Sequence, residues 1–143
     1  MDSRRVSDEL EIVALLNTYA RAVDTKDWEL YRSVFTADAH IDYSAGVFVG
    51  SLDDALEFFR GDFSALVTMS MHYITNIESE VDGDTARVRA MFYNPTQIKG
   101  LDELSMFGGY YHHELVRTPD GWRSRQLREE MVWTANSPRG GQA

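Results

Sequence analysis

The residue in this chain best suited to acid–base chemistry is His72, because an imidazole exchanges a proton near neutral pH. It stands in the stretch Met69-Ser-Met-His-Tyr-Ile-Thr-Asn76, and residues 69–81 are mostly β-branched, aromatic or sulfur-bearing. A turn at residues 82–84 follows, so the pattern predicts a strand that ends in a hairpin. Alternate side chains on a strand share a face, so the expected neighbours of His72 are Ser70, Ile74 and Asn76. Such a histidine is either a buried structural group or a general base.

A carboxylate that could orient this imidazole is Asp24, at the end of a predicted helix. Ser7 is a suitable N-cap and Asp8 follows in the first turn. A broad apolar stripe continues through Leu10, Val13, Leu16, Ala20 and Val23, with Ile12, Leu15 and Tyr19 alongside. Asp24 comes four residues after Ala20 and continues the inward-facing row. It could simply cap the turn that follows, but a carboxylate at this end of a helix opposes the helix dipole. That unfavourable placement favours a functional role.

The elements expected to position these two groups are helices first and long strands afterwards. Asp27 caps a short helix whose buried side is Trp28, Tyr31, Val34 and Phe35, and residues 39–43 and 47–49 form a hairpin about 44–46. A capping box at Ser51–Asp54 begins a helix over residues 52–66, which Gly61 ends or bends. Further strands are expected at 85–98, 105–117 and 122–133, and Pro95 implies a bulge or an edge.

This order of elements predicts an α+β fold in which a strongly curved antiparallel sheet wraps around the N-terminal helices. The sheet leaves a pocket at its mouth, where Asp24 could meet His72. We expect one domain over residues 1–143, with an ordered core at about 6–134 and a flexible tail from 137.

Composition excludes several classes of function. The absence of cysteine excludes disulfides and thiolate chemistry. Lysine and arginine number 14 against 23 acidic residues, and the net charge of −9 argues against a nucleic-acid binder. The N-terminus lacks the apolar core of a signal peptide and no run is long enough to span a bilayer, so we expect a cytoplasmic protein with no membrane contact.

The histidines and acids outside the candidate pair do not predict a metal site. His112 and His113 are adjacent and point to opposite faces of a strand, and His40 and Asp42 share a face without a third ligand. We therefore expect no metal and no cofactor.

Several motifs together resemble the SnoaL-like branch of the nuclear transport factor 2 superfamily, over roughly residues 6–134. The motifs are Tyr19-Ala-Arg-Ala-Val-Asp24, Asp27-Trp28, Val34-Phe35, Asp38-Ala39, Met71-His72-Tyr73-Ile-Thr-Asn76, Gly108-Gly109-Tyr110 and Asp120-Gly121-Trp122-Arg123. The resemblance implies a cone-shaped α+β barrel.

The positions of Asp24 and His72 are similar to the Asp-His dyad of scytalone dehydratase, hexachlorocyclohexane dehydrochlorinase and bacterial bile-acid dehydratase. In those enzymes the histidine removes a proton from carbon while a leaving group departs. The resemblance also implies roles for Tyr19, which matches a tyrosine of the bile-acid enzyme, and for Arg128, which looks like the pocket arginine. The sequence departs from these relatives at Asn94 or Thr96, where the bile-acid enzyme has an aspartate, and near Tyr19, where the dehydrochlorinase has lysine.

The expected function is a cofactor-independent lyase or isomerase that acts on a small hydrophobic cyclic substrate, steroid-like or polyketide-like. Tyr19 could equally be core, and Arg128 could belong to a solvated strand with charge pairs. The residues expected to bind the substrate are Tyr43, Asn94, Met71, Phe92, Tyr110 and His112, and the residues expected to form core or apolar pocket lining are Met69, Met71, Met91 and Phe92.

Two other functions remain open. Aldol-type polyketide cyclisation uses the same proton abstraction, and a non-catalytic ligand-binding or assembly module, such as a dioxygenase small subunit, would use the fold alone. We also expect a dimer or trimer in which Trp122, Trp133 and Tyr111 help to cover the outer face of the sheet.

Overall fold

The first element of the computed structural model, which describes residues 2–43 and 48–138, is the long helix α1, Ser3–Asp24. It begins earlier than the predicted start at Ser7, because the side chain of Asp2 accepts a hydrogen bond from the Arg5 backbone N–H at 2.8 Å and caps the helix there. In the described parts of the chain, no helix is both long and apolar enough to cross a membrane.

The buried face of α1 is only part of the broad stripe that was predicted. Leu10 is 66% exposed and Val13 is 36% exposed, so the row that was expected to face inward lies partly in solvent. The helix is rotated so that its buried residues are Asp8, Ile12, Leu15, Leu16, Tyr19, Ala22 and Val23. The apolar residues at 12, 15 and 19, beside the predicted row, therefore face the sheet.

Helix α2, Trp28–Arg32, is shorter than predicted, and the chain turns into strand β1, Phe35–Tyr43. Val34 and Phe35 are therefore not helical, although both are buried as expected. Strand β2, Phe48–Ser51, pairs antiparallel with β1, and the predicted turn at 44–46 lies outside the described residues.

The helical segment after β2 has the predicted extent but changes its winding. The predicted capping box of Ser51 and Asp54 is present and begins α3, Leu52–Phe58. The chain continues as a π-helical segment, Phe59–Phe63, which contains Gly61, and ends in α4, Ser64–Leu66. The change of winding at Gly61 agrees with the prediction of a weakened helix at that position.

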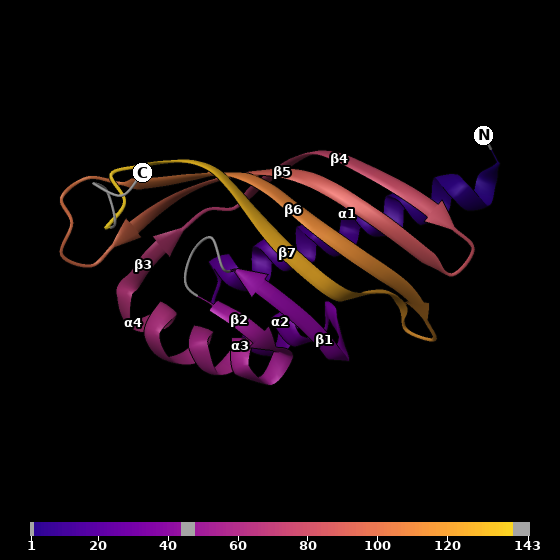
Figure 1. Ribbon diagram of the computed structural model, residues 1–143, viewed down its shortest axis with the longest axis horizontal. Coiled ribbons are helices and arrows are strands. Elements are labelled where there is room, and N and C mark those ends of the chain that lie inside the picture. The colour runs from indigo at the N-terminus through magenta and orange to yellow at the C-terminus, as the bar shows by residue number, and fades with distance from the viewer. Residues whose placement is uncertain (1, 44–47, 139–143) are drawn as a thin grey trace.

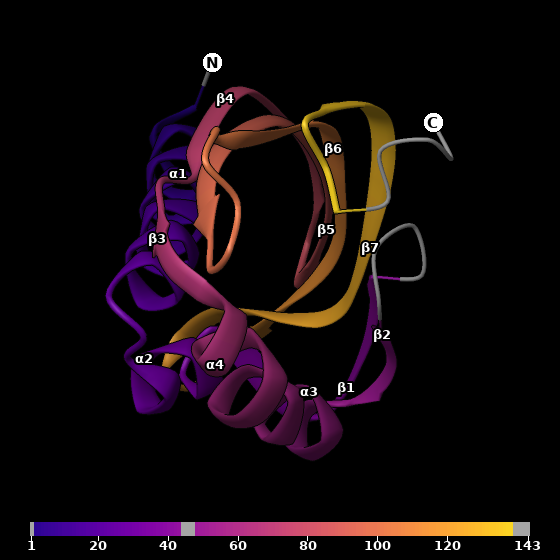
Figure 2. The same ribbon diagram turned by 90° about the vertical axis from the view of Figure 1, so that its left-hand side faces the viewer.

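The remaining strands are β3 (Val67–Ser70), β4 (Tyr73–Asp82), β5 (Thr85–Ile98), β6 (Ser105–Thr118) and β7 (Gly121–Ala135). They join β1 and β2 in one sheet of order β2-β1-β7-β6-β5-β3, with β4 also paired to β5. Figures 1 and 2 show that the sheet curls strongly without closing, with α1 beside β4 and with α2, α3 and α4 along one end. The predicted α+β architecture is confirmed. The sheet is not wholly antiparallel, however, because β1 and β7 pair in parallel.

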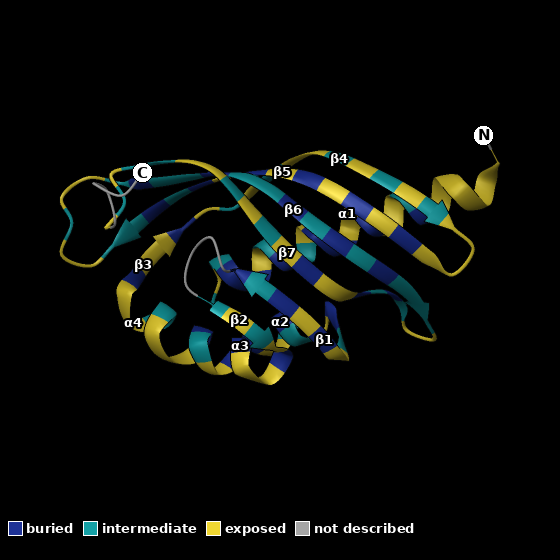
Figure 3. Ribbon diagram, viewed as in Figure 1, coloured by how far each residue is buried: buried dark blue, intermediate teal, exposed yellow. Residues whose placement is uncertain are grey.

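Strand β5 alternates as predicted, with Ala86, Val88, Ala90 and Phe92 buried and the intervening residues exposed (Figure 3). The same alternation corrects other expectations. Met69 and Met91 are 40% and 38% exposed, so neither is core or pocket lining. Trp122 and Tyr111 are each 1% exposed and lie inside, so they do not cover the outer face.

Trp133 lies on the outer face, 45% exposed, because β7 contains a bulge. Gly109 pairs with Met131 and Gly108 with Trp133, so Val132 is an extra residue that reverses the alternation. Gly108 has no side chain for a steric reason, since a Cβ at this position would lie 2.0 Å from Nε1 of Trp133.

Candidate functional site

The predicted strand over residues 69–81 is interrupted at Met71 and His72, where β3 ends and β4 begins. Both strands pair with β5, and Met71 donates its backbone N–H to the carbonyl of Pro95 at 3.1 Å. Pro95 has no N–H to return, so the ladder has a gap opposite Met71. Pro95 therefore marks this gap, and not the bulge or edge that was predicted, since it also pairs in regular register with Met106 of β6.

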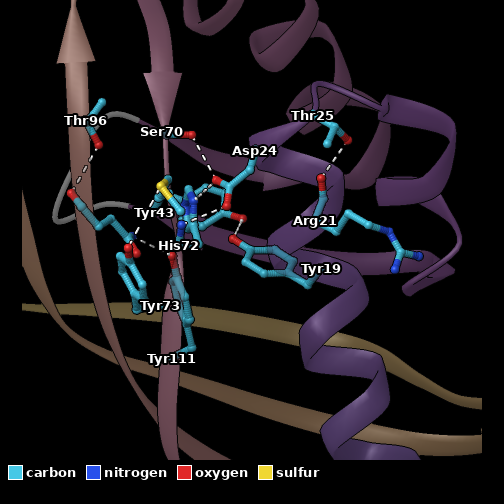
Figure 4. Close-up of polar contacts among 12 residues, drawn as sticks. Tyr19, Arg21, Asp24, Thr25, Tyr43, Ser70, His72, Tyr73, Thr96 and Tyr111 are labelled. Carbon is cyan, nitrogen blue, oxygen red and sulfur yellow. Dashed lines mark hydrogen bonds and ion pairs between the residues drawn. The ribbon is translucent and has the colours of Figure 1, made fainter.

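The interruption leaves the backbone N–H of His72 available to α1. It donates to Oδ2 of Asp24 at 2.8 Å, while Nδ1 of the imidazole lies 2.6 Å from Oδ1 of the same carboxylate (Figure 4). The hydroxyl of Ser70 donates to Oδ1 of Asp24 at 3.0 Å. The carboxylate at the end of α1 therefore holds the backbone and the ring of His72 together.

The shared face predicted for His72 is correct for Ser70 and Ile74 but wrong for Asn76. Asn76 adopts a positive φ of 50° at a bulge in β4, between Thr75 and Glu78, and it is exposed. The bulge shifts the alternation, so that Ile77 in place of Asn76 packs against the core.

The electrostatics of this pair favour an ionised carboxylate. Partial burial opposes the charge on Asp24, but the hydrogen bonds and charge of His72 outweigh it and lower the pKa of Asp24 below its usual value. A carboxylate beside Nδ1 fixes the tautomer in which Nδ1 carries the proton. Nε2 of His72 then carries the lone pair, and no described side chain hydrogen-bonds to it.

The end of α1 is fixed to the far side of the site by Lys26. This residue has a positive φ of 55°, and its ammonium donates to the carbonyls of Ser64 at 3.3 Å and Val67 at 2.6 Å. The lysine therefore joins the turn after Asp24 to α4 and to the start of β3.

His72 lines a cavity of about 750 Å³ inside the curved sheet. The volume suits a small organic ligand. Most of the wall is apolar or aromatic, and none of its described residues is lysine or arginine. The polar or titratable side chains of the wall are Tyr19, Tyr43, Asp62, Ser70, His72, Asn94, Thr96, Tyr111, Glu129, Thr134 and Ser137.

A chain of phenols connects α1, β1 and α2, and two of them, Tyr19 and Tyr43, lie in this wall. The hydroxyls of Tyr19 and Tyr43 are 2.5 Å apart, and those of Tyr43 and Tyr31 are 2.9 Å apart. Burial raises the pKa of each of these phenols well above its usual value, so they stay protonated and can act as hydrogen-bond donors. The ring of Tyr19 also meets the His72 imidazole edge-on, with centroids 6.4 Å apart.

Three of the predicted residues lie with His72 and Asp24 as expected. Tyr19, Tyr43 and Asn94 line the cavity and are buried. Tyr19 reaches it although its position on the helix differs from that of Asp24, because the cavity extends along the side of α1. Asn94 donates from Nδ2 to the hydroxyl of Tyr111 at 3.2 Å, while its Oδ1 is buried without a hydrogen-bond partner among the described residues.

Phe92 is buried but does not line the cavity, because it stacks against the ring of Tyr111 at a centroid distance of 4.5 Å. Phe92 therefore belongs to the core, which was one of its predicted roles, and it does not line the cavity as a substrate-binding residue would.

The other predicted residues were placed wrongly. Met71 is 50% exposed, since its side chain points away from the face that carries His72. Tyr110 stacks under the guanidinium of Arg89, and His112 pairs with Glu130 through Nε2 and Oε1 at 2.8 Å. Both lie on the outer face of β6, opposite its buried residues.

Arg128 is exposed and does not line the cavity. Its neighbours Leu127 and Glu129 face inward, since Leu127 is fully buried and Glu129 lines the cavity. Glu129 is not among the site residues predicted from the sequence, although its alternation with Leu127 and Met131 indicates an inward position. Burial, followed by the negative charge of Asp42, raises the pKa of Glu129 to about 7.

The curved sheet around a long helix, with a cavity inside it, is accompanied by a match to a protein family, the SnoaL-like domain. Residues 4–128 match that family, and the chain belongs to it. An uncharacterized protein of Mycobacterium tuberculosis is 37% identical over 122 residues, which cover 82% of this chain and 81% of the relative.

Solved structures extend the likeness. A protein of Novosphingobium aromaticivorans named as an aromatic ring hydroxylase is 30% identical, with a TM-score of 0.82 over 92% of this chain and 94% of the other. A protein of the same species named as a scytalone dehydratase has a TM-score of 0.87 at 17% identity, over 96% and 92% of the two chains. A hexachlorocyclohexane dehydrochlorinase has a TM-score of 0.84 at 18% identity, over 92% of this chain and 89% of the other. The last two likenesses show the fold.

Proposed function

We propose that this protein is a cofactor-independent lyase or isomerase. It removes a proton from carbon in a small, hydrophobic, cyclic substrate, steroid-like or polyketide-like. Nε2 of His72 is the base, and Asp24 orients the ring and stabilises the imidazolium that forms. The neighbours named as a dehydratase and a dehydrochlorinase catalyse eliminations by name, which supports this class of reaction.

One observation carries the proposal: Nδ1 of His72 lies 2.6 Å from Asp24 while the ring lines an apolar cavity. A carboxylate on one nitrogen raises the basicity of the other, which is left for a ligand. A histidine that was only structural would have no need of a cavity large enough for a ligand beside it.

The phenol chain supplies the second part of the chemistry. A carbanion or enolate needs hydrogen-bond donors that are already in place as the charge develops. Tyr19 is such a donor in the wall, and Tyr43 and Tyr31 support it through their hydrogen bonds. Arg128 has no part in this proposal because it lies outside the cavity.

Proton exchange at carbon tests the base without knowledge of the natural leaving group. The probe is 2-tetralone, a neutral bicyclic ketone, incubated with the protein in D2O and followed by NMR at the carbon next to the carbonyl. We expect the wild-type protein to accelerate the exchange and His72→Ala to lose about 10²- to 10⁴-fold of that acceleration. Tyr73→Phe, on the outer face, is the control and should exchange as the wild type does. Equal rates in wild type and His72→Ala would refute the proposal.

A second candidate is a non-catalytic ligand-binding subunit, favoured by the neighbour named as an aromatic ring hydroxylase at 30% identity. Within the described residues, no group of three histidine, aspartate or glutamate side chains is placed to hold a metal ion. A hydroxylase role would therefore draw its metal from a larger partner, and co-purification of an iron-containing subunit with this chain would favour it.

A further inference from the structure

Glu129 is a titratable group of the cavity that the proposed dyad does not use. It lies on the inner face of β7, between the inward-facing Leu127 and Met131, and lines the same cavity as His72. Among the described residues, none forms a hydrogen bond with its carboxyl group. A partly buried acid without a protein partner is available to a ligand.

The surroundings of Glu129 favour its neutral form. Phenols face it from three elements: Tyr19 on α1, Tyr31 on α2 and Tyr111 on β6. Asp42 on β1 adds a negative charge nearby, and no lysine or arginine lines the described wall. With its pKa at about 7, the carboxyl group carries its proton for much of the time at neutral pH and can donate a hydrogen bond.

A complementary acceptor lies in the same wall. Oδ1 of Asn94 is buried and has no hydrogen-bond partner among the described residues, while Nδ2 of Asn94 is bonded to Tyr111. Tyr111 pairs with Glu129 across β6 and β7. One donor and one acceptor therefore flank the same tyrosine, and a hydroxyl group of a ligand would satisfy both, because it accepts one hydrogen bond and donates another.

We propose that Glu129 donates a hydrogen bond to the hydroxyl oxygen of a neutral ring ligand, and that this wall rejects carboxylate ligands. The inference rests on the proposed function for its chemistry. In an elimination, His72 takes the proton from carbon, the electron pair forms the C=C bond and the C–O bond breaks. The proton of Glu129 leaves with the oxygen as water, and solvent exchange then restores both residues.

Two probes with the same ring test this recognition. 2-Naphthol carries a neutral hydroxyl group, whereas 2-naphthoate carries a carboxylate, and their binding is measured by fluorescence titration at pH 5.5 and pH 8. All proteins carry His72→Gln, so that the imidazole in the same cavity takes no part in the comparison. The buried phenols do not titrate there, and the nearby charged group Asp42 is present in every variant.

In the His72→Gln protein we expect the preference for 2-naphthol over 2-naphthoate to increase by about tenfold between the two pH values, as Glu129 ionises and repels the carboxylate. Adding Glu129→Gln should hold that preference constant within about twofold, whereas adding Glu57→Gln, an exposed residue of α3 outside the cavity, should leave the increase intact. Gln has nearly the shape of Glu, and near-ultraviolet circular dichroism checks that each variant is folded.

The proposal would be overturned if the preference for 2-naphthol still increased with pH in the Glu129→Gln variant. Equal binding of the two probes at pH 8, or failure of both to bind, would also overturn it. The readout is equilibrium binding without the imidazole. Failure of proton exchange in the wild-type protein would therefore reject the proposed lyase activity and leave this recognition role standing.

Discussion

His72 is held from two directions by one carboxylate, since Asp24 accepts both its backbone N–H and its Nδ1 proton. This double contact fixes the ring orientation, and no residue in the described part of the chain bonds to Nε2. Asp24 therefore has a structural role in addition to its electrostatic one, because its hydrogen bonds hold α1 to the segment between β3 and β4.

The substitution Asp24→Asn should therefore affect both the proton-exchange rate and the stability of the protein. We expect 2-tetralone exchange to fall on the order of 10²-fold, since the base remains but loses its orienting charge. Because the pKa of Asp24 is lowered by folding, the carboxylate stabilises the protein above its unfolded pKa and loses this effect as the pH falls through the folded pKa. Thermal melts should show the Asp24→Asn variant less stable than wild type at pH 7, with the difference narrowing towards pH 3. An unchanged exchange rate would contradict the orienting role.

The contribution of Glu129 to protein stability should depend on pH in the opposite sense to that of Asp24. Its pKa is about 7 in the folded protein against 4.5 when unperturbed, so the folded state binds more protons than the unfolded state between these values. The free energy of unfolding should then decrease as the pH rises from about 4.5 to 7. Urea titrations of wild type and Glu129→Gln should differ most above pH 7, where the variant is the more stable. A variant less stable than wild type at pH 8 would contradict the raised pKa of Glu129 in the folded protein.

The N-terminal part of α1 is joined to the β6–β7 hairpin by Asp8. Its carboxylate accepts two hydrogen bonds from the guanidinium of Arg117, at 2.8 and 3.0 Å, and one from Nε1 of Trp122 at 3.2 Å. Arg117 also bonds Asp84 and stacks over the Trp122 ring. Asp8 does not lie in the first helical turn, where the sequence pattern placed it, because α1 begins at Ser3. Its hydrogen bonds instead join α1 to the sheet.

We expect Asp8→Asn to lower the melting temperature at pH 7 much more than Glu9→Gln, which removes only an exposed pair with Arg5. The hydrogen bonds from Arg117 lower the pKa of Asp8, so this contribution is present at neutral pH and is lost as the pH falls through that lowered value. Melts followed by circular dichroism at pH 7 and pH 3 would measure it. Equal melting temperatures for the two variants at pH 7 would show that the ion pair does not fix the helix.

The outer face of the sheet carries an uncharged aromatic row, Tyr73, Tyr93 and Trp133. Neighbouring rings stack with centroids 5.9 and 6.0 Å apart, and all three are more than 40% exposed. Exposed methionines adjoin the row at positions 69, 71 and 91. The chain has a net charge of −9, so this uncharged row is where a second copy could approach with least repulsion.

We expect the protein to form a homo-oligomer through this row, because a two-fold axis brings the same patch of two copies together. Tyr93→Arg should shift the protein towards the monomer in light scattering, since it places like charges at the contact. Arg87→Glu, exposed on the same strand but away from the row, is the control. A wild-type protein that is already monomeric at high concentration would contradict this expectation.

Much of this architecture could be predicted from local patterns. Helical spacing, the capping box at Ser51 and the alternation in β5 each depend on a few neighbouring residues, so they indicated an α+β fold with a curved sheet. The pairing of Asp24 with His72 was also predictable, from an acid at the unfavourable end of a helix and motifs that resemble a family.

The inward or outward direction of side chains near bulges depended on the tertiary structure. The extra residues at Asn76 and Val132 reverse the alternation along β4 and β7, and no short pattern announces them. Arg128 and Glu129 are adjacent charged residues, and the alternation along β7 indicates which of them enters the cavity only if Leu127 is taken as core. That choice follows from the pairing of β7 with β1 and β6, which turns Glu129 inward because Leu127 belongs to the core.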